Sequence, residues 1–296
     1  MSRSTDARGL IPVLATPFHP DGSLDLESLR RLVAFSVASG ADGLAVFGFA
    51  SEGFTLTAAE RAAILGVVSA EAGPVLPVVA GVSATGTGDA VTQTLAAQEA
   101  GASVVMVIPP FMVKPSPAQI VDFYGTVAAA GLPVMVQDAP GSTGVTLPVP
   151  LIVELSKLDG VESVKVETQP TAPKVGAVID ATAGEFLVLG GQNALFVLEE
   201  YARGAVGTMP ASEFPDLLAQ ILRLYLAGAH DEARAAFNRL LPLVRFGLQP
   251  GIAWAIHKHV LVRRGVIASA TVRAPAVDAD AATLAALDLI LSDLAL

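Results

Sequence analysis

Short runs of apolar, often β-branched residues recur along the chain and alternate with longer segments of helical periodicity. Thr57 and Glu60 form a predicted capping box before a helix that ends near Gly73, and Ser116-Pro117 begins another helix. The runs that have the length and composition of buried strands cover residues 10–15, 43–47, 75–80, 104–108, 134–137, 161–166, 186–189 and 205–208. Such strands separated by helices are typical of a parallel sheet buried on both faces.

The number and spacing of these strand and helix units favour a closed barrel. A chain of 296 residues can form one large α/β barrel or two smaller domains. Eight strand–helix units before residue 222 favour an α/β fold of the (β/α)8 TIM-barrel type over an open doubly wound sheet. The remainder is mostly helical, with a loop over residues 269–280. We therefore expect a barrel over residues 1–222 and a C-terminal helical segment, residues 223–296, packed on it.

Composition excludes several classes of function. The net charge of −10 argues against a nucleic-acid partner, because few positive charges are available to neutralise phosphates. The chain has no cysteine, which excludes disulfides, thiolate nucleophiles and cysteine zinc sites. Residues 1–9 lack an apolar signal core, and no run of about 18 apolar residues predicts a membrane span. We expect a soluble, cytoplasmic protein that does not bind membranes.

Lys165 is the most unusual residue of the predicted strands. Alternation along the strand places Lys165 and Glu167 on one face, and Val164 and Val166 on the other. If both faces are buried, desolvation lowers the pKa of the lysine, and the neutral amine becomes a nucleophile towards ketones. The alternative is a lysine at the strand end that reaches solvent and pairs with Glu162 or Glu167.

Other polar segments follow the predicted strands and meet at the same end of a barrel, where catalytic groups lie in this fold. These segments are 48–52, 137–141 and 190–193. The hydroxyl of Ser51 and nearby backbone amides could hold a substrate carboxylate, with Glu52 as a proton shuttle. Alternatively, Ser51 caps the next helix and Glu52 is exposed near its start.

The two amide-bearing segments leave similar alternatives open. Gln137 and Asp138 are either polar contacts to a substrate or part of a turn before Pro140. Gln192 and Asn193 either bind substrate hydroxyls or cap the helix that follows, and capping is the favoured interpretation for Asn193.

Signatures of other chemistries are missing. The sequence contains no G-x-S-x-G elbow and no complete phosphate-binding loop. His257 and His259 are spaced i, i+2 on a predicted helix, so they point to different sides and form no metal-binding face. We expect a structural or surface role for all four histidines, a core position for Trp254, and no metal or organic cofactor.

With these residues in view, the chain resembles the dihydrodipicolinate synthase / N-acetylneuraminate lyase superfamily of Schiff-base-forming barrel enzymes. The similarity extends nearly from end to end and includes the motifs Thr16-Pro17-Phe18, Asp21-Gly22-Ser23, Leu56-Thr57-x-x-Glu60-Arg61, Pro109-Pro110-Phe111, Pro140-Gly141 and Gly204-Ala205-x-Gly207. The resemblance implies that Lys165 is the imine-forming lysine. It also implies a homotetramer built as a dimer of dimers.

Several positions depart from the usual family pattern. The strand-2 end reads GFASE, so Phe49 and Ala50 replace a pair of hydroxyl residues. Gln137 stands where the family usually has a tyrosine, and Ser142 where it has an arginine. These changes disfavour dihydrodipicolinate synthesis, and they weaken aldol cleavage, which normally uses the same tyrosine.

The 2-keto-3-deoxy-L-arabonate dehydratases resemble the chain more closely. Members of that subgroup carry an F-S-E-type strand-2 end, a Q-D-A-P strand-5 end and a K-x-E followed by prolines and a lysine. The corresponding segments here are residues 49–52, with an added alanine, residues 137–140, and Lys165-x-Glu167 followed by Pro170, Pro173 and Lys174.

We therefore expect a lyase that dehydrates a small 2-keto-3-deoxy sugar acid. Lys165 would attack the C2 ketone, a base would remove the C3 proton, and the C4 hydroxyl would leave as water. Glu52 is the expected acid/base group, Gln137 would orient the leaving group or a water, and Ser51 would hold the carboxylate. Further substrate contacts are expected from Ala50, Asp138, Glu167, Gln192 and Asn193. The alternatives are a pyruvate-dependent aldolase or dihydrodipicolinate synthase-like enzyme, and a non-catalytic barrel that binds keto acids.

Overall fold

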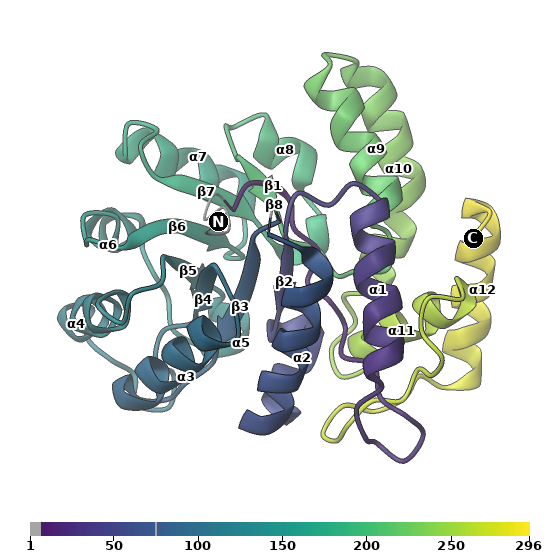
Figure 1. The fold of residues 1–296 in the computed structure, drawn as a ribbon. Coiled ribbons are helices and arrows are strands. Elements are labelled where there is room, and N and C mark those ends of the chain that lie inside the picture. The colour runs from purple at the N-terminus through teal and green to yellow at the C-terminus, as the bar shows by residue number, and fades with distance from the viewer. Residues whose placement is uncertain (1–6, 75) are drawn as a thin grey trace.

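The computed structural model describes residues 7–74 and 76–296. Within these residues, eight parallel strands form one sheet in the order β1-β8-β7-β6-β5-β4-β3-β2. The strands are β1 (Gly9–Leu10), β2 (Leu44–Val46), β3 (Val78–Val82), β4 (Val104–Val107), β5 (Val134–Asp138), β6 (Val161–Val166), β7 (Leu187–Gly190) and β8 (Gly207–Thr208). Val13 bridges Ala45 and Ala211, which joins the chain after β1 to β2 and closes the sheet. The predicted barrel is confirmed (Figure 1). Residue 75, where the third strand was expected to begin, lies outside the described residues.

Helices follow the strands in sequence and surround the barrel (Figure 1). They are α1 (Leu26–Ala38), α2 (Ala58–Ala72), α3 (Thr87–Glu99), α4 (Pro117–Ala128), α6 (Val149–Leu155), α7 (Thr171–Ala181), α8 (Val197–Tyr201) and α9 (Pro215–Leu226). The capping boxes at Thr57 and Ser116 are formed. Shorter helical turns follow the strands at η1 (Phe49–Ser51), η2 (Gly53–Thr55), α5 (Pro140–Thr143) and η3 (Gln192–Ala194).

Apolar side chains pack in two layers, one inside the barrel and one between the strands and the surrounding helices. Val164 and Val166 of β6 belong to the large cluster between the strands and the surrounding helices. A smaller cluster fills the interior and includes Met106, Met135 and Leu189. Side chains that alternate along a strand therefore enter one layer or the other, which fixes the inward direction of the remaining residues.

The C-terminal segment consists of α10 (His230–Phe246), α11 (Ala253–Arg263) and α12 (Ala281–Leu294). These helices lie with α9 on one side of the barrel, beyond α1 (Figure 1). Their apolar cluster includes Phe237, Leu240 and Leu287, and it extends to Phe214 and Leu10 at the barrel. The expected boundary after residue 222 falls inside α9. Among the helices of residues 7–74 and 76–296, none is both long and apolar enough to span a membrane.

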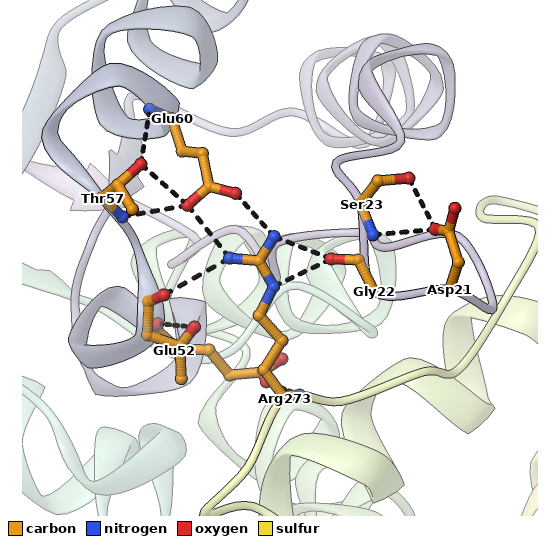
Figure 2. Close-up of polar contacts among 8 residues, drawn as sticks. Asp21, Gly22, Ser23, Glu52, Thr57, Glu60 and Arg273 are labelled. Carbon is orange, nitrogen blue, oxygen red and sulfur yellow. Dashed lines mark hydrogen bonds and ion pairs between the residues drawn. The ribbon is translucent and has the colours of Figure 1, made fainter.

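Arg273 anchors the loop between α11 and α12 to the N-terminal half of the chain. Figure 2 shows its guanidinium group between Glu60 at the start of α2 and the carbonyl of Gly22. The guanidinium group donates to both carboxylate oxygens of Glu60, at 2.6 and 3.0 Å, and lies over the Phe18 ring at 4.2 Å. Hydrogen bonding by Arg273 lowers the pKa of Glu60 to about 2. The loop is thereby held against the end of the barrel where α2 begins.

We predict that Arg273→Met lowers the free energy of unfolding by about 1.5–3 kcal/mol at neutral pH, because it removes hydrogen bonds to a charged group. The folded-state pKa of Glu60 lies below its ordinary value, so this stabilisation is present above pH 4.5 and is lost as the pH falls towards 2. Urea denaturation across this range should show the two proteins converging in acid. Arg263→Met, which removes a more exposed pair with Asp288, is the control and should have a smaller effect. A deficit for Arg273→Met that does not change with pH would contradict the assignment.

Candidate active site

A cavity of ≈ 200 Å³ lies at the carboxyl ends of the strands. Phe49 and Ala50 line it from the turn after β2, Lys165 and Glu167 from β6 and the residues after it, and Met209 from the segment after β8. Its position is the one that the polar strand ends predict. The cavity is also lined by residues of the C-terminal segment, so it extends beyond the barrel itself.

Lys165 points into the barrel. Its side chain is 5% exposed, and Nζ lies 3.3 Å from Oε1 of Glu167. The neighbouring Val164 and Val166 belong to the outer layer, as the alternation along β6 requires. Lys165 lies in register with Gln137 of β5 and Leu189 of β7. The amine is therefore both buried and paired with Glu167, and it faces the cavity rather than bulk solvent.

The carboxylate of Glu167 is fixed by residues of β5, of β6 and of the turn η3 after β7. Gln137 donates from Nε2 to Oε2 of Glu167 at 2.8 Å, while Lys165 faces Oε1. The backbone N–H of Gln192 donates to Oε1 at 3.4 Å, and its side-chain amide donates to the Glu167 carbonyl at 3.0 Å. A carboxylate held beside a buried ammonium can accept its proton and release a nucleophilic amine.

The turn after β2 has a left-handed backbone that decides which of its residues face the cavity. Phe47 has φ 62° and Glu52 has φ 53°, values that are uncommon for residues other than glycine. A Cβ at Gly81 would lie 2.4 Å from the Phe47 carbonyl oxygen, so only glycine permits this close approach. With this geometry Phe49 and Ala50 line the cavity, and Glu52 does not.

Glu52 lies instead in a buried cluster with the C-terminal segment. Its side chain is fully buried and forms an ion pair with Nζ of Lys258, which is also fully buried. The backbone N–H of Arg273 donates to Oε2 of Glu52 at 3.0 Å, and Lys258 donates to the Thr271 carbonyl at 2.7 Å. Burial lowers the pKa of Lys258 to about 8, while the charge of Glu52 opposes this shift. Glu52 thus connects the β2 turn to α11 and its loop.

Ser51 is likewise buried and does not line the cavity. Its carbonyl accepts a hydrogen bond from the Thr16 hydroxyl at 2.6 Å. Within the described parts of the chain, its own hydroxyl has no hydrogen-bond partner. The structure therefore separates Ser51 and Glu52 from the space beside Lys165.

Asp138 points away from the cavity. It is the last residue of β5, which continues one residue beyond its predicted end. Gln137 faces inwards, so Asp138 faces the surrounding helices. Its Oδ2 lies 2.7 Å from Nζ of Lys174 on α7 and accepts a hydrogen bond from Thr168. Burial raises the pKa of Asp138, opposed by these contacts. Asp138 thus connects β5 to α7.

Asn193 lies at the cavity wall and also joins three segments of the chain. Its Oδ1 accepts from the backbone N–H of Ala211 at 2.9 Å, and its Nδ2 donates to the Val244 carbonyl at 3.2 Å. Its side chain makes these contacts instead of capping α8, the helix that follows, so the favoured capping role is wrong. Gln192 and Asn193 are both left-handed, so this turn, like the one after β2, has an uncommon backbone conformation.

Trp254 and His257 of α11 also line the cavity, although they were expected to have structural roles. Trp254 donates from Nε1 to the Phe49 carbonyl at 2.6 Å. His257 is 5% exposed, and its Nδ1 lies 2.7 Å from Oε1 of the buried Glu213. The spacing i, i+3 places Trp254 and His257 on one face of the helix, which is the signal that sequence reasoning overlooked. Which helix face meets the barrel depends on tertiary packing.

Comparison with known proteins shows which family the chain matches. A family model described as the dihydrodipicolinate synthetase family matches residues 6–294. An L-2-keto-3-deoxyarabonate dehydratase from Azospirillum brasilense is 35% identical over 278 residues, which cover 90% of this chain and 88% of that protein. A 4-hydroxy-tetrahydrodipicolinate synthase from Methanosarcina mazei is 32% identical over 241 residues, which cover 80% of this chain and 81% of that protein.

Solved structures show the same fold over almost the whole chain. A dihydrodipicolinate synthase from Rhodopseudomonas palustris has a TM-score of 0.92 and 29% identity, with 99% of each chain covered. A prophage protein of the dihydrodipicolinic acid synthase family from E. coli K12, solved in complex with pyruvate, has a TM-score of 0.90 and 26% identity. The alignment covers 98% of this chain and 99% of that one.

The buried Lys258 predicts a specific dependence of stability on pH. Its folded-state pKa of about 8 lies below the ordinary value of 10.5, so the unfolded chain binds more protons between these values. We expect this residue to make the free energy of unfolding rise with pH from 8 to 10.5. Lys258→Met should weaken that rise, and it should destabilise the protein by about 3–5 kcal/mol because Glu52 loses its partner.

Denaturant unfolding at several alkaline pH values measures both effects. The double variant Lys258→Met/Glu52→Leu removes both charges and should recover stability relative to Lys258→Met alone. An equal dependence on pH in the wild type and Lys258→Met would exclude Lys258 as its source.

Proposed function

The chain belongs to the dihydrodipicolinate synthetase family, and on that premise we propose that it is a lyase that forms an imine between Lys165 and a small 2-keto acid. The observation that carries the proposal is the position of the Lys165 amine, which faces the cavity 3.3 Å from Glu167. Lys165 supplies the nucleophile, and Glu167 supplies a fixed proton acceptor beside it.

Each side chain around Lys165 has a defined part in the proposed reaction. Glu167 accepts a proton from the Lys165 ammonium, and the free amine attacks the C2 ketone with loss of water. The resulting iminium withdraws electrons from C3 and acidifies its protons. Glu167 returns its proton to the carbinolamine hydroxyl, which leaves as the water, and the regenerated carboxylate then removes the C3 proton. Gln137 holds the carboxylate in place through Oε2.

The assignment of the base differs from the expectation based on the sequence. Glu52 was the expected acid/base group, but its carboxylate is engaged by Lys258 and by the backbone of Arg273. Moving it to the cavity would leave the Lys258 ammonium buried without its partner, which is costly. Glu167 already lies at the cavity, so the proposal gives the proton transfer to it.

Dehydration of a 2-keto-3-deoxy sugar acid is the reaction that we propose. The dehydratase from Azospirillum brasilense supports it, as a relative that is similar over 90% of the chain. Polar and aromatic side chains line the cavity beyond Lys165, including Gln192, Asn193 and Trp254. Such groups suit a short hydroxylated chain, and the volume of ≈ 200 Å³ suits a small substrate.

The competing reaction is carbon–carbon chemistry on pyruvate. Several relatives are named 4-hydroxy-tetrahydrodipicolinate synthases, and one structural neighbour was solved with pyruvate. The residue of β5 that faces Glu167 is Gln137, whose amide donates a hydrogen bond but is not a general acid at neutral pH. A proton relay through this position is therefore not available, which favours dehydration.

We predict that borohydride reduction in the presence of pyruvate adds one reduced adduct per chain, and that peptide mass mapping places it on Lys165. The other four lysines (Lys114, Lys157, Lys174 and Lys258) serve as internal controls and should remain unmodified. Lys165→Ala should give no adduct, because it removes the amine. An unmodified wild-type chain, or an adduct on Lys258, would reject the proposed imine chemistry.

We also predict the product formed from 2-keto-3-deoxy-L-arabonate. Loss of water should yield a keto-acid semialdehyde, measured by mass spectrometry and by reaction with a carbonyl reagent, without release of pyruvate. Lys165→Ala should form neither product. Stoichiometric pyruvate, measured with lactate dehydrogenase, would instead assign the enzyme to aldol cleavage.

A further inference from the structure

Glu213 and His257 form a buried pair at the wall of the cavity. His257 belongs to α11, and Glu213 belongs to the segment between β8 and α9. Nδ1 of the imidazole lies 2.7 Å from Oε1 of the carboxylate, and the two side chains are 6% and 1% exposed. His257 lines the same cavity as Lys165.

The pair leaves one imidazole nitrogen available to a ligand. Nδ1 is engaged by Glu213, and within residues 7–74 and 76–296 no protein group forms a hydrogen bond with Nε2. A buried histidine with only a structural role is expected to have both nitrogens satisfied. A carboxylate on one nitrogen fixes the ring and leaves the other for proton transfer, which is the arrangement of an acid/base histidine.

The surroundings of the ring also fix its position. A Cβ at Gly247, which follows α10, would lie 2.7 Å from Cε1 and 3.1 Å from Nδ1 of His257. It would also lie 3.3 Å from Nδ2 of Asn193. The imidazole ring thus packs directly against the backbone of Gly247. Three segments of the chain therefore hold the ring at the cavity wall.

We propose that His257 is the catalytic acid that protonates the departing hydroxyl of the substrate, and that Glu213 is the residue that positions its ring. This inference rests on the proposed function and adds to it the second proton transfer of the dehydration. Glu167 lies beside the imine nitrogen, and from there it removes the C3 proton. The C4 hydroxyl lies farther along the substrate, and His257 donates a proton to its oxygen.

The hydroxyl is lost by elimination from the enamine. After Glu167 has taken the C3 proton, the electron pair of the enamine forms the C3–C4 double bond as the C4–O bond breaks. The proton on Nε2 of the His257 imidazolium passes to the oxygen, which leaves as water. Loss of a C5 proton and protonation at C3 convert the conjugated iminium into the C4–C5 enol, which tautomerises to the aldehyde. Hydrolysis of the iminium then releases the semialdehyde and the Lys165 amine, and His257 regains a proton from solvent.

Two measurements on the full chain separate this role from imine formation. The first is the dehydration rate of 2-keto-3-deoxy-L-arabonate. The second is the exchange of pyruvate C3 protons in deuterium oxide, which requires the imine and C3 deprotonation but involves no leaving group. His257→Gln should lower dehydration by about 10²–10⁴-fold and leave the exchange rate close to that of the wild type. Glu167→Gln should lower both rates.

Additional variants test the position of the ring and the specificity of the effect. Glu213→Gln and Gly247→Ala should shift the ratio of dehydration to exchange in the same direction as His257→Gln, because they displace the imidazole without removing it. His259→Gln is the matched control, since His259 lies on the same helix and pairs with Asp278. It should change neither rate.

The outcomes distinguish this inference from the proposed function. Absence of both dehydration and exchange in the wild type would reject the proposed function itself. With both present, an unchanged dehydration rate in His257→Gln would overturn the inference. Parallel losses of dehydration and exchange, in either His257→Gln or Gly247→Ala, would assign the pair a structural role only and would equally overturn it.

Discussion

The ion pair between Lys165 and Glu167 is the constraint around which the mouth of the barrel is built. An ammonium inside an apolar barrel loses its hydration, and only an opposite charge with further hydrogen bonds offsets that loss. Glu167 provides the charge, while Gln137 and the backbone of Gln192 fix the carboxylate. The carboxyl ends of β5, β6 and β7 are therefore matched to one another, and together they hold this charged pair inside the barrel.

The C-terminal segment supports this mouth in two ways. Trp254 and His257 of α11 form part of the cavity wall. On the next residue of the same helix, Lys258 holds Glu52 and thereby the left-handed turn that presents Phe49 and Ala50. Helices that add apolar burial to the barrel thus also place polar groups beside its opening.

Much of the fold follows from local patterns, whereas the site required tertiary information. Period-two alternation correctly turns Lys165 inwards, and the same rule explains the outward direction of Asp138 once β5 is seen to include that residue. The direction of Glu52 is set by a left-handed turn, and this turn requires the close approach of Phe47 to Gly81 of another strand. His257 meets Glu213 across 44 positions of sequence. No local pattern encodes such a meeting.

The chain is synthesised from its N-terminus, so α11 is made after all eight strands. A ribosome produces all the strands before residue 253, so a growing polypeptide could close its β-sheet and bury Lys165 early. At that stage the pocket would still lack its indole and imidazole wall, and Glu52 would have no lysine to neutralise it. Of the residues that line the cavity, those of α11 are thus the last to leave the ribosome.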